Sequence, residues 1–205
     1  MNDVLNEFSN TALKNLYTAL FLGGARLTKD DNYEVYLALE RIHLIQQYLK
    51  RNNINLNFNY EVSDKGSFIF SQTLMAHKLY REWTSKGDNV DYISPGQLNV
   101  NVMNLWVSLF SHKGKKRLYI PSSHFSLEAR ETFQILFNDI MHFEIVANSM
   151  YFTIVQVKEW FIQSYQYRRP LYELNVLLNV LGPGEVSTLR DVRKQFDLKR
   201  GVQYI

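Results

Sequence analysis

A run of alternating side chains over residues 54–62 constrains the fold of this chain more than any other feature. Apolar residues occupy every second position of INLNFNYEV, and Asn or Glu stands between them. Because a β-strand sends successive side chains to opposite faces, the run predicts a strand with one apolar face. Asp64-Lys65-Gly66 then predicts a three-residue hairpin loop, with Gly66 in the left-handed conformation. A two-stranded ribbon is marginal alone, so further structure must cover this hairpin.

The register of the hairpin predicts which side chains are buried. Val62 stands opposite Phe68, and Tyr60 opposite Phe70, so both strands present large side chains to one side. Phe58 belongs to the same face. We expect Phe58 and Tyr60 to be buried. Asn57 and Asn59, which alternate with them, should face solvent or a neighbouring subunit.

Helical periodicity predicts a pair of helices ahead of the hairpin. Residues 3–22 carry apolar side chains at helical spacing and precede Gly23-Gly24, a common helix end. Asp31 and Glu34 form a capping-box pattern before a second amphipathic run that continues to Lys50. Helices joined by a short loop usually pack antiparallel, which we expect of these two.

The middle of the chain mixes helical and strand patterns. Residues 72–86 predict a helix, and residues 118–120 predict a short strand that Pro121 ends. Residues 98–110 have helical spacing but begin with the alternation of a strand, and residues 133–137 also fit either structure. Local pattern leaves both alternatives open.

The C-terminal part predicts further helices. Asn148-Ser149 is a candidate cap for an amphipathic run over residues 150–167. Residues 171–181 form another apolar segment, and Ser187 can cap a last charged helix that ends at Phe196.

Together the patterns predict one α+β domain over residues 1–205. Helices at 3–50 and 149–197 would form a bundle, and the β-rich middle at 54–138 would be inserted into it. We find no internal repeat in the sequence. Apolar residues make up 46% and aromatic residues 14% of the 205 residues, which suffices for one core.

Composition excludes several classes of protein. The chain has no cysteine, so disulfides, thiol nucleophiles and thiolate zinc sites are excluded. The formal charge of +3 is no argument for a nucleic-acid-binding protein. No apolar run approaches the ~20 residues of a membrane span, and the acidic start MNDVLNEF is unlike a signal peptide.

Catalytic motifs are absent from the sequence. The histidines lack ligand spacing such as HExxH; they are His43, His77, His112, His124 and His142. His142-Phe143-Glu144 matches the HxE of zinc deaminases, but the required cysteine pair is missing. No GxSxG elbow is present. We therefore expect no catalysis, no required metal and no cofactor.

Two basic segments and one apolar segment are candidates for interaction. Residues 112–117 (HKGKKR) have two interpretations. They form a solvated turn, or they contact DNA or the acidic surface of a partner. YQYRR, residues 165–169, mixes aromatic and basic groups as single-strand binders do, or complements a helix end. Residues 174–200 resemble two thirds of a helix-turn-helix without a recognition helix. Residues 171–181 are apolar all round, which indicates contact with another subunit. The candidate residues are Lys113, Lys115, Lys116, Arg117, Arg168, Arg169, Leu174, Leu177, Leu178 and Leu181.

The order of these segments resembles the head-to-tail adaptors of short-tailed phages, the tail tubular protein A group. Leu20–Gly24 is similar to that family's first helix end, Arg51–Asn59 to its aromatic–Phe–Asn segment, and Ile93–Val102 to its Pro-led strand. Lys116–Tyr119 and Phe133–Phe137 are similar to two of the family's strands, Phe143-Glu144 to its Phe-Glu pair, and Met150–Tyr165 to its long penultimate helix. The family's Trp is missing, Ile120 replaces an Asp, and Ala147-Asn148-Ser149 replaces a Pro.

This resemblance implies a non-enzymatic virion protein in which residues 98–102 form a strand. It implies a homo-oligomeric, twelvefold ring that binds the portal protein and the tail nozzle or fibre proteins and passes DNA without sequence specificity. The protein would lie in the virion neck, and in the host cytoplasm during assembly, without a membrane. Two alternatives are a regulator that binds host machinery such as RNA polymerase and a nucleic-acid-binding protein, whose affinity would depend steeply on salt.

Overall fold

The structure of the protein is a computed structural model that describes residues 2–54, 58–63, 66–84, 89–114, 117–138 and 143–153, with isolated residues beyond. The first half consists of α1 (Asn2–Leu22), β1 (Arg26–Leu27), β2 (Asn32–Tyr36), α2 (Leu39–Arg51), β3 (Tyr60–Val62), β4 (Ser67–Ser71) and α3 (Leu74–Trp83). A 3₁₀ turn at Pro95–Gln97 connects it to α4 (Val100–Phe110), β5 (His112–Lys113), β6 (Arg117–Pro121), α5 (Leu127–Asn138), β7 (Glu144–Val146) and β8 (Ser149–Thr153). The expected α+β class is confirmed.

The two halves repeat one arrangement of elements. In each, a helix precedes two strands, and a second helix precedes two more. The four strands form an antiparallel sheet, in the order β1-β2-β4-β3 in the first half and β5-β6-β8-β7 in the second. Within the described residues helices and strands alternate rather than forming one inserted β-region, and most of the expected C-terminal helical part at 149–197 lies outside them. The repeat lies in the order of the elements, where the sequence pattern predicted none.

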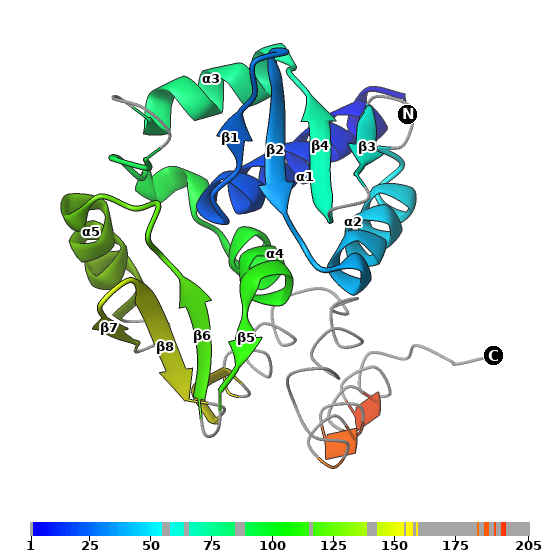
Figure 1. Ribbon diagram of the computed structural model, residues 1–205. Helices are drawn as coiled ribbons and strands as arrows, with labels where there is room; N and C mark the ends of the chain where they lie inside the picture. The colour runs from blue at the N-terminus through cyan, green and yellow to red at the C-terminus, as the bar shows by residue number, and fades with distance from the viewer. Residues whose placement is uncertain are drawn as a thin grey trace.

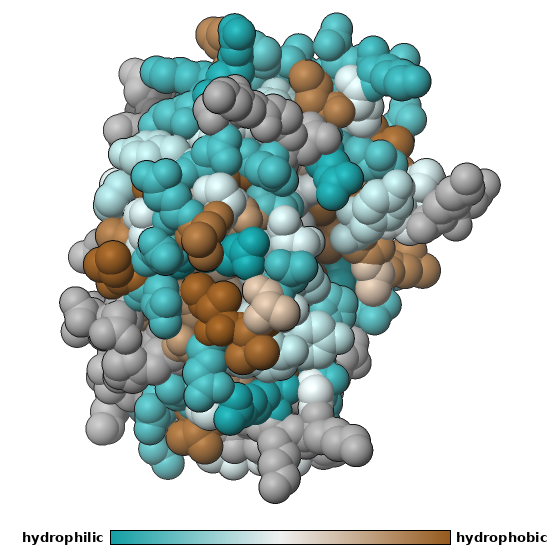
Figure 2. Space-filling model, turned by 60° about the vertical axis from the view of Figure 1, so that its left-hand side comes forward, coloured by the Kyte–Doolittle hydropathy of each residue, from teal (hydrophilic) through white to brown (hydrophobic). Residues whose placement is uncertain are grey.

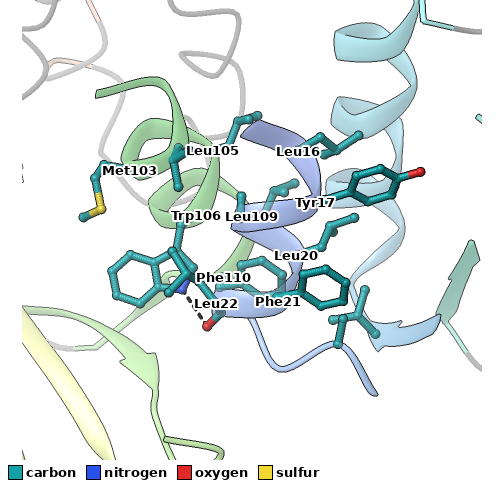
Figure 3. Close-up of a cluster of buried hydrophobic side chains, with 14 of the residues drawn as sticks. Leu16, Tyr17, Leu20, Phe21, Leu22, Met103, Leu105, Trp106, Leu109 and Phe110 are labelled. Atoms are coloured by element: carbon teal, nitrogen blue, oxygen red, sulfur yellow. Dashed lines mark hydrogen bonds between the residues drawn. The ribbon is translucent and has the colours of Figure 1, made fainter. Parts of the chain in front are cut away.

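Helices α1 and α4 pack against each other between the two sheets (Figure 1). Figure 3 shows the two helices side by side, with Leu105, Leu109 and Phe110 labelled on α4 and Leu16 and Leu20 on α1, all of them in the buried core. A Cβ atom added at Gly23 would lie 1.9 Å from Cζ of Phe110, so glycine is needed where α1 ends against α4.

The predicted end of the first helix is confirmed. Helix α1 ends at Leu22, and Gly24 after it has a φ of +88°. The amide of Gly23 donates to the carbonyls of Ala19 and Leu20, as expected of a helix end.

The predicted hairpin is confirmed in its register but not in its length. Tyr60 pairs with Phe70 and Val62 with Phe68, and Gly66 has a φ of +80°. The strand begins at Tyr60 rather than at residue 54.

The predicted burial of the hairpin is only partly right. Phe58 is buried as expected, and Asn59 is exposed. Tyr60 is only partly buried, because it lies on β3 at the edge of the sheet. Asn57 lies outside the described residues.

The predicted capping box at Asp31 is wrong. Residues 32–36 are strand β2, in which buried Tyr33 and Val35 pair with Phe70 and Phe68 of β4. Burial of four large side chains outweighs the local capping signal, since propensity yields to tertiary context. Helix α2 begins only at Leu39.

Three further assignments are corrected. Residues 98–102 do not form the strand that the resemblance implied, because Asn99 caps α4 by accepting from the backbone amides of Asn101 and Val102. Residues 133–137, which read as a strand in that resemblance, belong to helix α5. Residues 149–153 are strand β8 rather than the start of a long helix. The segment at 171–181 lies outside the described residues.

The surface beside α5 and β7 is mostly hydrophilic with separate hydrophobic patches (Figure 2). Leu127 and Ile135 of α5 and Val146 of β7 are among the exposed apolar residues. None of the helices within the described residues is long and apolar enough to cross a membrane.

Candidate functional site

The carbonyl ends of the two central helices are held by side chains from elsewhere in the chain. Trp106 Nε1 donates to the Leu22 carbonyl oxygen at 3.0 Å (Figure 3), and His124 Nε2 lies 2.8 Å from the same oxygen. The guanidinium of Arg41 donates to the carbonyls of Ser108 and Ser111, at the end of α4. Because the last carbonyls of a helix lack partners within it, these contacts satisfy both buried helix ends.

His124 makes the stability of this junction dependent on pH. The pKa of His124 is lowered from 6.5 to about 4, mainly by burial. Its hydrogen bond to Leu22 raises the pKa, whereas the charges of Arg26 and Arg130 lower it. The imidazole is therefore neutral at pH 7, and its Nε2–H donates to Leu22. Between pH 6.5 and 4 the unfolded chain binds more protons than the folded one, so stability falls as the pH falls.

We expect His124→Gln to remove about 2–3 kcal/mol of this pH dependence between pH 7 and 4.5. Urea unfolding of both proteins at the two pH values measures it. Carboxylates titrate in both proteins, so the difference between them isolates His124. Equal pH dependence in the two would contradict a neutral buried imidazole.

The outward face of the second sheet carries a row of aromatic rings. His112, Tyr119 and Tyr151 are directly opposite one another on β5, β6 and β8, and Glu144 of β7 ends the row. The ring centroids of His112 and Tyr119 are 5.3 Å apart, with 25° between the ring planes. Those of Tyr119 and Tyr151 are 5.9 Å apart, at 32°. His112 is exposed and both tyrosines are partly exposed, while the alternate residues Leu118, Ile120, Met150 and Phe152 are buried.

The segment of sequence from β5 to the start of β6 is rich in cations. Residues 92–127 contain no Asp or Glu, and their Lys and Arg residues all fall within residues 113–117. Lys113 is exposed on β5. Arg117, on β6, forms an ion pair with Glu144. Lys115 and Lys116 lie outside the described residues.

The structure does not join the other sequence candidates into a site. His77 Nδ1 lies 2.7 Å from Gln72 Nε2, and His43 is exposed on α2. Glu144, from the rejected deaminase pattern, pairs with Arg117. Within the described ranges, no group of three or more His, Cys, Asp and Glu could hold a metal ion. Candidates outside the described residues are His142, Arg168, Arg169, Leu174, Leu177, Leu178 and Leu181.

Sequence reasoning found the basic turn but missed the ring row. The strand at residues 118–120 was predicted, which places Tyr119 on the face opposite its two neighbours. Its partner Tyr151, however, was assigned to a helix at 150–167, so the two rings could not be placed side by side. The alternation of buried and partly exposed side chains over residues 149–153 is the pattern that indicates strand β8 and places Tyr151 beside Tyr119.

Comparison of the structure with solved structures finds chains of a homing endonuclease. These are structures of I-DmoI. One, in complex with DNA and Ca, has 13% sequence identity and a TM-score of 0.48, and the match covers 88% of this chain and 98% of that chain. Another, from work on mesophilic variants of I-DmoI, has 12% identity and a TM-score of 0.47, with the same coverage of both chains. No family model and no curated protein matches the sequence.

These findings correct the expected function. The similar structures are those of an endonuclease and not of a phage adaptor, so the resemblance to the adaptor family is wrong, as are the virion role and the classification as a non-enzyme that followed from it. Portal, tail and ring partners are likewise unsupported. The physical reason is the fold, because the segments read as adaptor strands at 98–102 and 133–137 are helices. At these identities and TM-scores the activity of I-DmoI is not transferred, and the function must follow from this chain's own residues.

Proposed function

We propose that this protein binds nucleic acid through the outward face of the β5-β6-β8-β7 sheet. The observation that carries the proposal is the row of aromatic rings on one exposed face, with the exposed Arg117 on the same face of β6 and the exposed Lys113 on the neighbouring edge strand β5. Cations bind the phosphate backbone, and aromatic rings contact bases; few other ligands require both.

The distribution of charge supports this proposal better than the net charge does. The whole chain has a formal charge of +3, which is slight. Residues 113–117 alone contain four cations and no acid, in a stretch of sequence free of acids from residue 92 to 127. In the structure Glu144 pairs with Arg117, one of these four cations, and the remaining local excess of positive charge attracts a polyanion even when the protein as a whole is nearly neutral.

We expect binding that weakens steeply with salt, because each phosphate contact releases condensed counterions. Fluorescence polarisation of labelled single-stranded and duplex oligonucleotides, from about 50 to 200 mM NaCl, measures the slope of log affinity against log salt. Lys113→Ala should lower the magnitude of this slope by about one.

A matched control is Lys29→Ala, which removes an exposed lysine from the corresponding β1–β2 turn of the first half. Its slope should equal that of the unmodified protein. The proposal is overturned if neither oligonucleotide binds at about 50 mM salt, or if both lysine variants change the slope equally.

A further inference from the structure

The two sheets present chemically different rows of side chains at equivalent positions. In the second sheet the row is His112, Tyr119, Tyr151 and Glu144. In the first sheet the paired residues on the corresponding strands are Arg26, Glu34, Ile69 and Glu61. The fold repeats, but the aromatic surface does not.

The first row is unsuited to a polyanion. It carries two carboxylates, Glu34 and Glu61, against the single cation Arg26, and Ile69 offers no π-face. Carboxylates on the contact surface repel phosphate. Contact with nucleic acid therefore falls on the second half.

The second row is suited to bases with free faces. The planes of neighbouring rings lie within 32° of each other, so the row presents near-parallel π-surfaces to which a flat base can be added. Burial, and secondarily the charge of Arg41, lower the pKa of His112, so this ring is neutral at pH 7 and stacks as an ordinary aromatic. Arg117 lies on the same face of β6 as Tyr119, and Lys113, whose register with Leu118 places it on the other face, adds an exposed positive charge at the edge strand β5.

A duplex cannot use this row. Its base faces are covered by the adjacent base pairs, and only base edges are open in the grooves. Unpaired bases, by contrast, can turn a face to a protein ring, and base–aromatic stacking is the usual source of affinity for single strands.

We infer that the second sheet binds an unpaired nucleic-acid strand by stacking bases on His112, Tyr119 and Tyr151, and that the first sheet takes no part. This inference rests on the proposed function and specifies its ligand. The exposed cations Lys113 and Arg117 attract the backbone, while the rings hold the bases.

The test compares one unstructured oligonucleotide with its duplex by fluorescence polarisation, using the full chain. The single strand should bind more tightly than the duplex. Tyr119→Leu and Tyr151→Leu should each weaken single-strand binding about 5- to 100-fold and change duplex binding less than about 2-fold. Tyr119→Phe, which retains the ring, should restore single-strand binding.

The matched control is Ile69→Ala, at the position of the first sheet that corresponds to Tyr151; it should leave binding unchanged. Circular dichroism of each variant establishes that it is folded. If both ligands bind but the duplex binds as tightly as the single strand, or if the leucine variants bind the single strand normally, the inference is overturned and the proposed function stands. A weakening with Ile69→Ala equal to that with Tyr151→Leu also overturns it. If neither ligand binds, the proposed function itself fails.

Discussion

Replacing Trp106 by alanine is expected to lower the free energy of unfolding by about 3–5 kcal/mol. The indole is fully buried on α4, with its ring centroid 5.0 Å from that of Phe133 and 6.3 Å from that of Phe152. Its Nε1–H donates to Leu22 at the end of α1, so the same side chain joins the second half to the first half (Figure 3). Removal creates a cavity and breaks that link. Urea denaturation followed by far-UV circular dichroism measures the loss.

Trp106→Phe separates the two contributions. It keeps a six-membered ring in the core but removes the hydrogen bond together with the five-membered ring of the indole, while His124 still donates to the Leu22 oxygen. Since the carbonyl is not left without a partner, we expect a loss of about 1–2 kcal/mol. An alanine variant that loses less than the phenylalanine variant would contradict the packing shown by the structure.

Local sequence patterns predicted correctly those elements in which the apolar residues of the pattern are also the buried ones. Helix α1 and the pairing of Tyr60 with Phe70 follow directly from apolar spacing. The signal failed at residues 31–36 and 98–102, where a capping pattern occurs in a strand and a strand alternation begins a helix. In both places long-range packing decides the structure. The pattern of a short stretch of sequence contains no information about that packing.

The repeat in the fold could not be predicted, because the two halves do not conserve residue types at equivalent positions. Where the first sheet has Arg26, Glu34 and Ile69, the second has His112, Tyr119 and Tyr151. Only the alternation of buried and outward side chains is common to both, and many sequences satisfy it. The basic turn of the candidate site was visible because charge requires no fold to be recognised. The ring row was not, because it depends on the pairing of three strands.

Replacing Phe58 by alanine should cost about 3–5 kcal/mol of folding free energy, a loss comparable to that at Trp106 but in the first half of the chain. Phe58 is 3% exposed and lies just before strand β3, so its burial does not depend on strand pairing of its own. Its ring stacks on Phe68 and Phe70, with centroids 6.1 and 5.9 Å away, and it lies 5.7 Å from Tyr17 of α1. Alanine would leave three aromatic rings around an unfilled cavity.

The neighbouring Asn59 supplies the matched control. Its side chain is exposed, and its carbonyl, which a substitution to alanine retains, accepts from the Ser71 amide. Asn59→Ala should therefore change stability by less than about 0.5 kcal/mol. Urea unfolding of the two variants under identical conditions measures the difference between adjacent positions. Similar losses at both positions would show that the apolar alternation of this segment does not determine which side chain enters the core.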